Sequence, residues 1–304
     1  MKSKIVAINN IREFWDENTC GLVPNSGFKN LDEYYKSVSD HRYNYQREIL
    51  KYSPFSEYKN KKVLEIGIGA ASDACEFVKN GAYYYGIDLT PSSVKFAQER
   101  LKHQFNYNKD LIKCGNAEKL PFEDNSFDLV YSFGVIHHTS NINKIVSEIH
   151  RVLKPKGKFY VMVYNKNSIF YYIEIVLFRR LLFYMSKSKI IKKLIKLFIR
   201  DKFKREKLFK YIERTQERFK NVKNPSNQDL LNSSSDHADC PYASVFNKKS
   251  SFQLFNQFKD LKTYVYFIEK NNSLFWQIFH YIIRPFENFL SSKFGWYRIV
   301  IGNK

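Results

Sequence analysis

The most constraining feature of the sequence is the stretch 61–73, which reads Lys-Lys-Val-Leu-Glu-Ile-Gly-Ile-Gly-Ala-Ala-Ser-Asp. Residues 63–66 form a short, mostly apolar run with a β-branched residue at each end, which is typical of a buried parallel strand. Gly67 and Gly69 follow at once, where the chain can turn sharply and approach a ligand because no Cβ interferes. From residue 70 the apolar spacing becomes helical. Strand, glycine turn and helix together predict the nucleotide-binding edge of a doubly wound α/β sheet.

A second apolar run, 83–87, ends in Asp88, which lies 19 residues after Gly69. An acid at the tip of that strand can accept hydrogen bonds from both hydroxyls of a ribose. The alternative is that Asp88 only caps the helix that starts near Pro91, and the two roles are compatible. The glycine turn and the acid together favour a cofactor that contains adenosine.

The dinucleotide pattern would require a third glycine at position 72, where the chain has Ser72. Two further blocks are more informative: 115–139, Gly-Asn-Ala-Glu-Lys-Leu-Pro-Phe through Gly-Val-Ile-His-His-Thr, and 151–159, Arg-Val-Leu-Lys-Pro-Lys-Gly-Lys-Phe. In this order they resemble the class I S-adenosylmethionine-dependent methyltransferases, particularly the small-molecule branch of the ubiquinone- and menaquinone-biosynthesis type. The resemblance covers residues 61–164 and extends more weakly to 14–21, 41–43 and 295–297. Ala71 replaces the third glycine of the family, and we expect its methyl group to tighten the turn without abolishing binding.

The resemblance implies an α/β, Rossmann-like class I methyltransferase fold with a seven-stranded, mostly parallel sheet and helices on both faces. We expect strands at 62–66, 83–88, 111–114, 127–133, 158–164, 263–269 and 296–301, the last antiparallel, and helices at 70–80, 91–105, 142–153 and 250–258. The predicted organisation is a helical N-terminal cap (1–60), a cofactor-binding core (61–165), a basic helical lid or insert with a loop (166–248), and a C-terminal completion of the sheet (249–304).

The same resemblance, with the rule that ligands bind at the carboxyl ends of parallel strands, assigns the cofactor site. The expected cofactor is S-adenosylmethionine, with S-adenosylhomocysteine as the product. Glu65 either holds the amino group of the cofactor or fixes the backbone N–H groups of the turn. No metal is expected, because the four cysteines are scattered without a Cys-x-x-Cys pair. The predicted cofactor-binding residues are Glu65, Gly67, Ile68, Gly69, Asp88, Leu89, Asn116, Ala117, Glu118, Phe133 and Gly134.

His137 and His138 are the candidates for acid–base catalysis, since a histidine near its ordinary pKa can take a proton from a hydroxyl as the methyl group transfers. The alternative is a structural or orienting role for each. Five further residues are candidates for substrate contact: Trp15, His41, Tyr43, His237 and Tyr242. For each residue of the N-terminal segment, the alternative is a plain helical layer over the edge of the sheet.

The positive charge is concentrated after the core. Residues 166–220 hold seventeen Lys or Arg and five Asp or Glu, a net +12 of the total +20. On a helix over 190–200 the apolar and basic residues separate onto two sides, which suits a helix lying on an anionic membrane. The alternative is a lid with solvated lysines.

The most apolar stretch, 169–185, is interrupted by charges, so no transmembrane helix is expected. Residues 1–14 lack the apolar core of a signal peptide, which favours a cytoplasmic protein, with peripheral association at the inner face of a membrane as an open alternative.

The leading hypothesis is an enzyme that moves a methyl group from S-adenosylmethionine to an O, N or C nucleophile of a small molecule by in-line displacement. Two alternatives stay open. One is a nucleic-acid (RNA) methyltransferase, which the basic charge favours. The other is a non-catalytic cofactor-binding protein. The sequence does not reveal the acceptor, the type of atom methylated or the oligomeric state.

Overall fold

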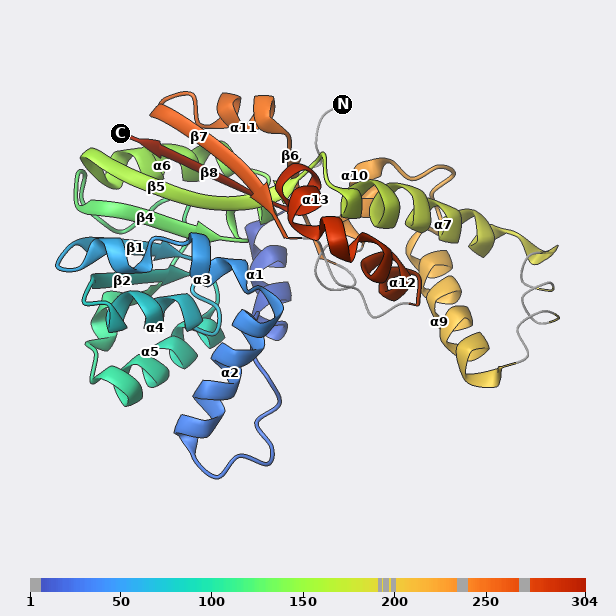
Figure 1. Ribbon diagram of the computed structural model, residues 1–304, viewed down its shortest axis with the longest axis horizontal. Coiled ribbons are helices and arrows are strands. Elements are labelled where there is room, and N and C mark those ends of the chain that lie inside the picture. The colour runs from blue at the N-terminus through green and yellow to red at the C-terminus, as the bar shows by residue number, and fades with distance from the viewer. Residues whose placement is uncertain (1–6, 191–192, 194–196, 198–200, 234–239, 268–273) are drawn as a thin grey trace.

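The computed structural model describes the chain except residues 1–6, 191–192, 194–196, 198–200, 234–239 and 268–273. Its centre is a mixed sheet with strand order β3-β2-β1-β4-β5-β8-β7, and β6 pairs with β5 off this path. All strand pairs are parallel except those of β8 with β5 and β7. The predicted α/β fold with one antiparallel strand is therefore confirmed (Figure 1). The strands are β1 (Lys62–Ile66), β2 (Tyr83–Asp88), β3 (Ile112–Cys114), β4 (Phe127–Phe133), β5 (Leu153–Asn165), β6 (Val245–Phe246), β7 (Lys259–Tyr266) and β8 (Tyr297–Asn303).

Neighbouring residues of the central strands pack into different apolar clusters because side chains alternate between the two faces of a sheet. Val63 of β1 belongs to one cluster, with Phe77 and Leu101 from helices of one face. Leu64 belongs to the other, with Ile149. Burial on both faces explains why these strands read as apolar runs instead of an alternating pattern. The first cluster contains residues of α4 (Ser72–Lys79) and α5 (Pro91–Phe105), and the second contains residues of α6 (Ile142–Val152) and α11 (Lys248–Leu254).

The N-terminal segment is helical, as expected. Arg100 of α5 joins it to the core: this buried guanidinium donates to the carbonyl oxygens of Tyr35 (3.1 Å) and Ala70 (2.6 Å). Because a buried arginine needs acceptors for its N–H groups, these contacts fix the segment beside the glycine turn. The elements are α1 (Ile8–Glu17), α2 (Leu31–Tyr45), α3 (Glu48–Tyr52) and the 3₁₀ turn η1 (Phe55–Tyr58). Two further 3₁₀ turns, η2 (Lys109–Leu111) and η3 (Ile136–His138), lie in the core.

Several predicted boundaries differ from the structure. The helix expected from residue 70 begins at Ser72, because Ala71 is left-handed, with φ 58° and ψ 25°. The strand expected over 158–164 is longer, and the insert adds the unpredicted strand β6 to its end. The helix expected over 250–258 spans Lys248–Leu254, since Asn247 and Ser250 form a capping box. The strand expected over 263–269 spans Lys259–Tyr266. Most of the helix expected over 190–200 lies outside the described residues.

Helices after the core project away from the sheet and form a helical lobe (Figure 1). The segment after the core and the C-terminal segment meet in this lobe, where Trp276 Nε1 donates to Glu174 Oε2 at 3.1 Å. Part of the predicted C-terminal segment thus packs with the insert. In the part of the chain that the structure describes, no helix is both long and apolar enough to cross a membrane. The lobe consists of the π-helix η4 (Tyr171–Phe178), α7 (Arg179–Lys187), α9 (Lys202–Arg218), α10 (Asn227–Asn232), α12 (Leu274–Ile283), the 3₁₀ turn η5 (Arg284–Phe286) and α13 (Glu287–Phe294).

Candidate active site

The glycine turn after β1 has a conformation that requires glycine. Gly67 has a φ of +82°, and a Cβ at this position would lie 2.2 Å from Val135 Cγ2. Its N–H donates to the carbonyl oxygen of Ile87 at 2.8 Å, so the turn is joined to the end of β2. Gly69 also has a positive φ, and a Cβ there would lie 3.2 Å from the carbonyl oxygen of Cys20. The turn therefore leaves a cradle of bare backbone that side chains would fill.

Asp88, at the tip of β2, is bound to the turn and to the start of α5. Its Oδ2 accepts from the N–H of Gly69 at 3.2 Å, and its Oδ1 accepts from the N–H and Oγ1 of Thr90 at 2.9 and 2.8 Å. Burial raises the pKa of Asp88, and the bonds from Thr90 and Gly69 oppose that shift. Each carboxylate oxygen can accept more than one hydrogen bond, so these contacts leave acceptor capacity for a ligand.

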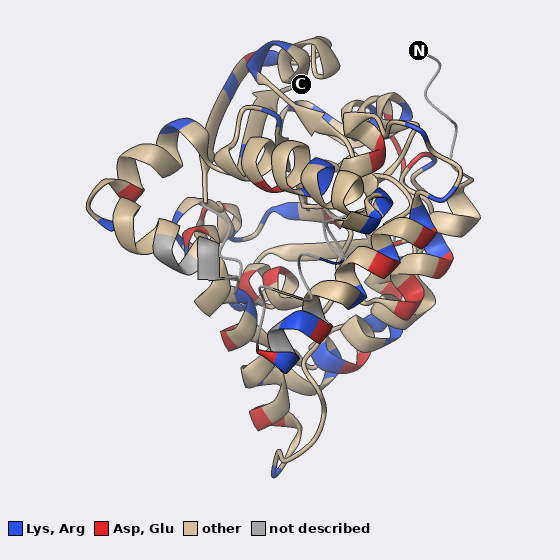
Figure 2. Cartoon of the chain, turned by 90° about the vertical axis from the view of Figure 1, so that its right-hand side faces the viewer, with Lys and Arg blue, Asp and Glu red and all other residues tan. Residues whose placement is uncertain are grey.

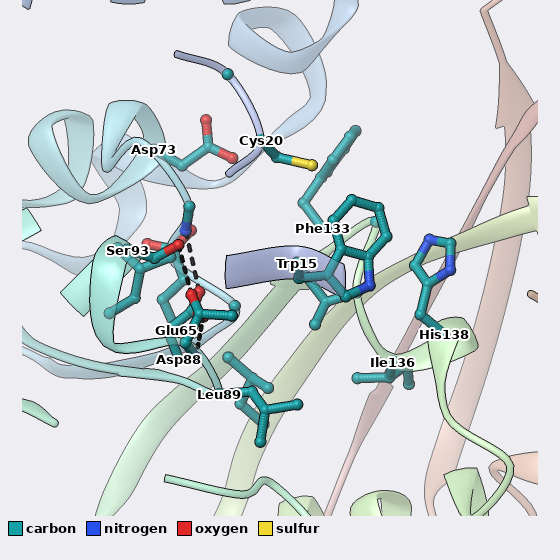
Figure 3. Close-up of a pocket in the computed structure, with 18 of the residues that line it drawn as sticks. Trp15, Cys20, Glu65, Asp73, Asp88, Leu89, Ser93, Phe133, Ile136 and His138 are labelled. Atoms are coloured by element: carbon teal, nitrogen blue, oxygen red, sulfur yellow. Dashed lines mark hydrogen bonds between the residues drawn. The ribbon is translucent and has the colours of Figure 1, made fainter. Parts of the chain in front are cut away.

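A cavity of about 340 Å³ opens at the carboxyl ends of β1, β2 and β4. Figure 3 shows Glu65, Asp73 and Asp88 on one side of it and Trp15, Phe133 and His138 on the other. This position is where a doubly wound sheet binds its ligand. The structure brings together thirteen of the predicted site residues as its lining: Trp15, His41, Glu65, Gly67, Ile68, Gly69, Asp88, Leu89, Asn116, Ala117, Phe133, Gly134 and His138.

Four predicted residues lie outside this lining. Glu118 instead accepts from Thr139 Oγ1 at 3.0 Å and from Asn141 Nδ2 at 3.1 Å, so it ties two loops together. The hydroxyl of Tyr43 donates to Asp73 Oδ1 at 3.0 Å. The others are His137 and Tyr242, considered below. His237, the remaining candidate, lies outside the described residues.

Glu65 is a buried acid in the cavity wall. The hydroxyl of Tyr84 donates to its Oε2 at 2.6 Å. Burial, followed by the negative charge of Asp73, raises the pKa of Glu65 well above its ordinary range. Burial and Asp73 thus favour the neutral carboxyl group, whereas the hydrogen bond from Tyr84 and the positive charge of Arg42 oppose this rise in pKa.

The lining also contains residues that the sequence patterns did not single out. Arg42 Nε donates to Asp73 Oδ1 at 2.8 Å, and the hydroxyl of Tyr131 donates to Asp73 Oδ2 at 3.0 Å. This network joins α2, α4 and β4 at the cavity wall. Arg42 stands in the 41–43 block, but its partner is 31 residues away, so a local pattern could not identify the pair. Other lining residues missed from the sequence include Ile8, Ile11, Tyr45, Gln46, Ser93, Met162, Tyr164 and Tyr297.

The two adjacent histidines have different surroundings. His138 lines the cavity, and its ring lies 5.0 Å from that of Trp15, in an edge-on arrangement. Its Nδ1 is 2.9 Å from the backbone carbonyl oxygen of Tyr242. A carbonyl oxygen only accepts, so neutral His138 carries its proton on Nδ1 and has a lone pair on Nε2. Tyr242 thus takes part through its backbone. Of the two histidines, only His138 lines the cavity.

His137 is fully buried and packs between His138 and Tyr164, with ring centroids 4.3 and 4.0 Å away. Burial, followed by the neighbouring His138, lowers the pKa of His137 well below its ordinary value. The unfolded chain therefore binds a proton at His137 more tightly than the folded protein does. The stability contributed by His137 is therefore present above the unfolded pKa of about 6.5 and is lost as the pH falls below it.

We accordingly expect the His137→Phe variant to lose less stability than the wild type between pH 6.5 and 5.5. The difference in the free energy of unfolding should be up to about 1.4 kcal/mol per pH unit. Urea unfolding at pH 7.5, 6.5 and 5.5 measures this change. The control is Ile149→Val, which alters another fully buried side chain that binds no proton and should retain the wild-type pH dependence of stability. An unchanged pH dependence in His137→Phe would contradict the assignment.

Comparisons with known proteins agree with this geometry. Residues 64–161 match the family described as "Methyltransferase domain". Sterol 4-C-methyltransferase strm-1 of Caenorhabditis elegans is 29% identical over 151 residues, which cover 50% of this chain and 42% of the relative. Phosphoethanolamine N-methyltransferase 2 of the same organism is 33% identical over 131 residues, covering 42% of this chain and 29% of the relative. The chain thus spans less than half the length of these relatives.

A solved methyltransferase structure from Archaeoglobus fulgidus aligns over 89% of this chain and 100% of its own, with 14% identity and a TM-score of 0.48. At that level of likeness, the fold assignment depends on the strand order described above. In the portion of the chain that the structure describes, no group of three or more His, Cys, Asp or Glu is placed to hold a metal ion. The matched family, the glycine turn and Asp88 at the tip of β2 lead to one conclusion. Residues 64–161 are a class I S-adenosylmethionine-dependent methyltransferase domain.

Proposed function

We propose that the whole protein transfers a methyl group from S-adenosylmethionine to a nucleophile of a small molecule. The observation that carries this proposal is a single cavity that joins the glycine turn, Asp88 and His138. When bound, S-adenosylmethionine supplies a methyl group activated by its positive sulfur. The protein then needs mainly to hold the nucleophile in line and to accept its proton.

We assign the cofactor to the side of the cavity with the acidic residues. The bare backbone of 67–69 suits close approach of the methionine portion, and the free acceptor capacity of Asp88 suits the ribose hydroxyls. Glu65 suits the positively charged amino group, because its carboxyl ionises when such a charge approaches. The other assigned contacts are Leu89, Asn116 and Ala117 for the adenine, and Phe133 and Gly134 near the sulfur. Glu118 is assigned an indirect role, since its side chain holds the loop at Thr139 and Asn141.

The acceptor is assigned to the opposite side, near Trp15, His138 and Tyr164. Aromatic and aliphatic side chains predominate there, whereas the acids Glu65, Asp73 and Asp88 gather at the other side (Figure 3). This contrast favours an uncharged, partly apolar acceptor. Nε2 of His138 takes the proton that a hydroxyl or amine nucleophile loses as its bond to the methyl carbon forms. The two relatives named above act, by their names, on a sterol and on phosphoethanolamine, which supports a small-molecule acceptor over RNA.

Three finer points belong to this proposal. The motif blocks support kinship with the ubiquinone- and menaquinone-biosynthesis branch. The proposed division of the chain is 1–60, 61–165, 166–248 and 249–304, with part of the last segment packed against the insert through Trp276 and Glu174. The net +12 of residues 166–220 further supports peripheral association with an anionic membrane at the inner, cytoplasmic face.

Calorimetric titration with S-adenosylhomocysteine tests the cofactor site. If the amino group of the ligand ionises Glu65, binding at pH 7 should release up to about one proton. The heat of binding should then depend on the ionisation enthalpy of the buffer, for example in phosphate and Tris. Glu65→Gln should abolish this dependence and weaken binding. Glu118→Gln, which changes an acid outside the cavity, should leave the buffer dependence intact.

Absence of S-adenosylhomocysteine binding would contradict the proposed function as a whole. Binding without proton release in the wild type would contradict only the role of Glu65. The two failures are therefore distinguishable.

A further inference from the structure

The first part of the helical lobe is apolar on both of its sides. Leu177, Leu181 and Tyr184 are 50 to 65% exposed and are spaced by four and three residues, so they form one outward stripe. Leu182 and Phe183 are buried on the inward side. A helix at the surface of a soluble protein ordinarily turns polar residues outward. This segment therefore has a second apolar face that is largely exposed, with the hydroxyl of Tyr184 at its edge donating to Asn224 Oδ1 at 3.4 Å.

The C-terminal part of the lobe also exposes large apolar side chains. Ile282 of α12, Phe286 of η5 and Phe289 of α13 are 61 to 65% exposed. On the inward side Trp276 and Ile283 are buried. We call Leu177, Leu181 and Tyr184 the first stripe, and Ile282, Phe286 and Phe289 the second stripe. Large apolar side chains gathered in this way mark an interaction surface.

The charge around the stripes indicates what covers them. Arg180 lies within the first stripe and Arg284 within the second, and residues 166–220 carry a net +12. Figure 2 faces the side from which the lobe projects and shows both basic and acidic residues there, between long uncharged stretches. A second copy of this chain would bring the same positive charge to the contact, which disfavours self-association. An anionic bilayer supplies the opposite charge and accepts apolar side chains at its interface.

We propose that the helical lobe docks on an anionic membrane surface, with the two stripes inserted at the level of the headgroups. This extends the charge-based proposal above to particular residues, and it assigns part of the contact to α12, η5 and α13, outside the basic insert. In this arrangement the lobe lies on the membrane surface. No helix of the described residues is both long and apolar enough to cross a membrane.

A chain of aromatic contacts links this lobe to the wall of the cavity. Phe170, at the start of the lobe, lies 5.8 Å from Trp276 and 5.1 Å from Trp296. Trp296 stacks on Tyr164 at 4.2 Å, and Tyr164 lines the cavity. A docked lobe would therefore hold the acceptor side of the cavity close to the membrane. If the proposed function holds, this favours an acceptor that partitions into lipid.

Vesicle sedimentation tests the proposal. The wild type should sediment with vesicles of phosphatidylglycerol and phosphatidylcholine at low salt, and much less with phosphatidylcholine alone or at high salt. The double variant Phe286→Ser/Phe289→Ser, and separately Leu177→Ser/Leu181→Ser, should lower the partition constant at least about tenfold. The control, Leu50→Ser/Tyr83→Ser, removes two apolar side chains of comparable exposure from the cap and from β2, and it should stay within about twofold of the wild type.

Titration of each variant with S-adenosylhomocysteine shows whether it is folded, independently of lipid. The proposal is overturned if the wild type does not bind anionic vesicles, or if the control loses as much binding as the stripe variants. It is also overturned if sedimentation velocity shows a dimer that the stripe variants dissociate, since a second copy would then cover the stripes.

Discussion

Replacing Asp88 by alanine should raise the Kd for S-adenosylhomocysteine by about 100-fold. In the folded protein its carboxylate orients the turn through Gly69 and the start of α5 through Thr90, while retaining acceptor capacity toward the cavity. A hydrogen bond to a charged group contributes about 1.5–3 kcal/mol. Loss of two such bonds to ribose hydroxyls therefore costs about 3 kcal/mol, which is about 100-fold in affinity. Isothermal calorimetry measures the change directly.

The matched control for this substitution is Asp128→Ala. Asp128 also accepts from a backbone N–H, that of Lys62 at 2.8 Å, and from Lys154 Nζ at 2.8 Å, but it lies outside the cavity lining. Both variants lose comparable contacts within the protein, so both should be less stable to urea. Only Asp88→Ala should lose affinity. A Kd within about threefold of the wild type would leave Asp88 with the capping role alone.

For His138→Ala we expect a fall in the rate of methyl transfer of about 10²–10⁴-fold, the usual contribution of a positioned general base. Affinity for S-adenosylhomocysteine should stay near the wild-type value, because Asp88 and Glu65, assigned to the ribose and the amino group, lie across the cavity from His138 (Figure 3). The measurement is transfer of tritium from methyl-labelled S-adenosylmethionine, in single turnovers, to whichever member of a panel of lipophilic phenols and amines the wild type methylates.

His137→Phe provides the comparison, because this neighbouring histidine is buried outside the cavity lining. It should retain most of the rate while changing the pH dependence of stability. Equal losses in the two variants would indicate that the pair acts only through packing. An unchanged rate in His138→Ala would remove the base from the mechanism and would point to a nucleophile that loses its proton without help from the protein.

The sequence was sufficient to predict the core of the fold because the signals there are local. Buried parallel strands read as apolar runs, and a turn such as that at Gly67 excludes side chains by backbone geometry alone. The strand bounds of β1, β2 and β4 agree with the prediction. The error at the start of α4 is also local, since Ala71 adopts a left-handed conformation that its residue type seldom takes.

The tertiary structure decided which of the candidates share a site. Arg42 and Asp73, or His138 and the carbonyl of Tyr242, meet only after distant segments have folded together, 31 and 104 residues apart. The short strand β6 and the packing of Trp276 on Glu174 depend likewise on neighbours far along the chain. Spacing in the sequence records which side chains can share one strand or helix face. Contacts between elements are set by packing in three dimensions, and for that reason the sequence alone did not distinguish His138 from His137.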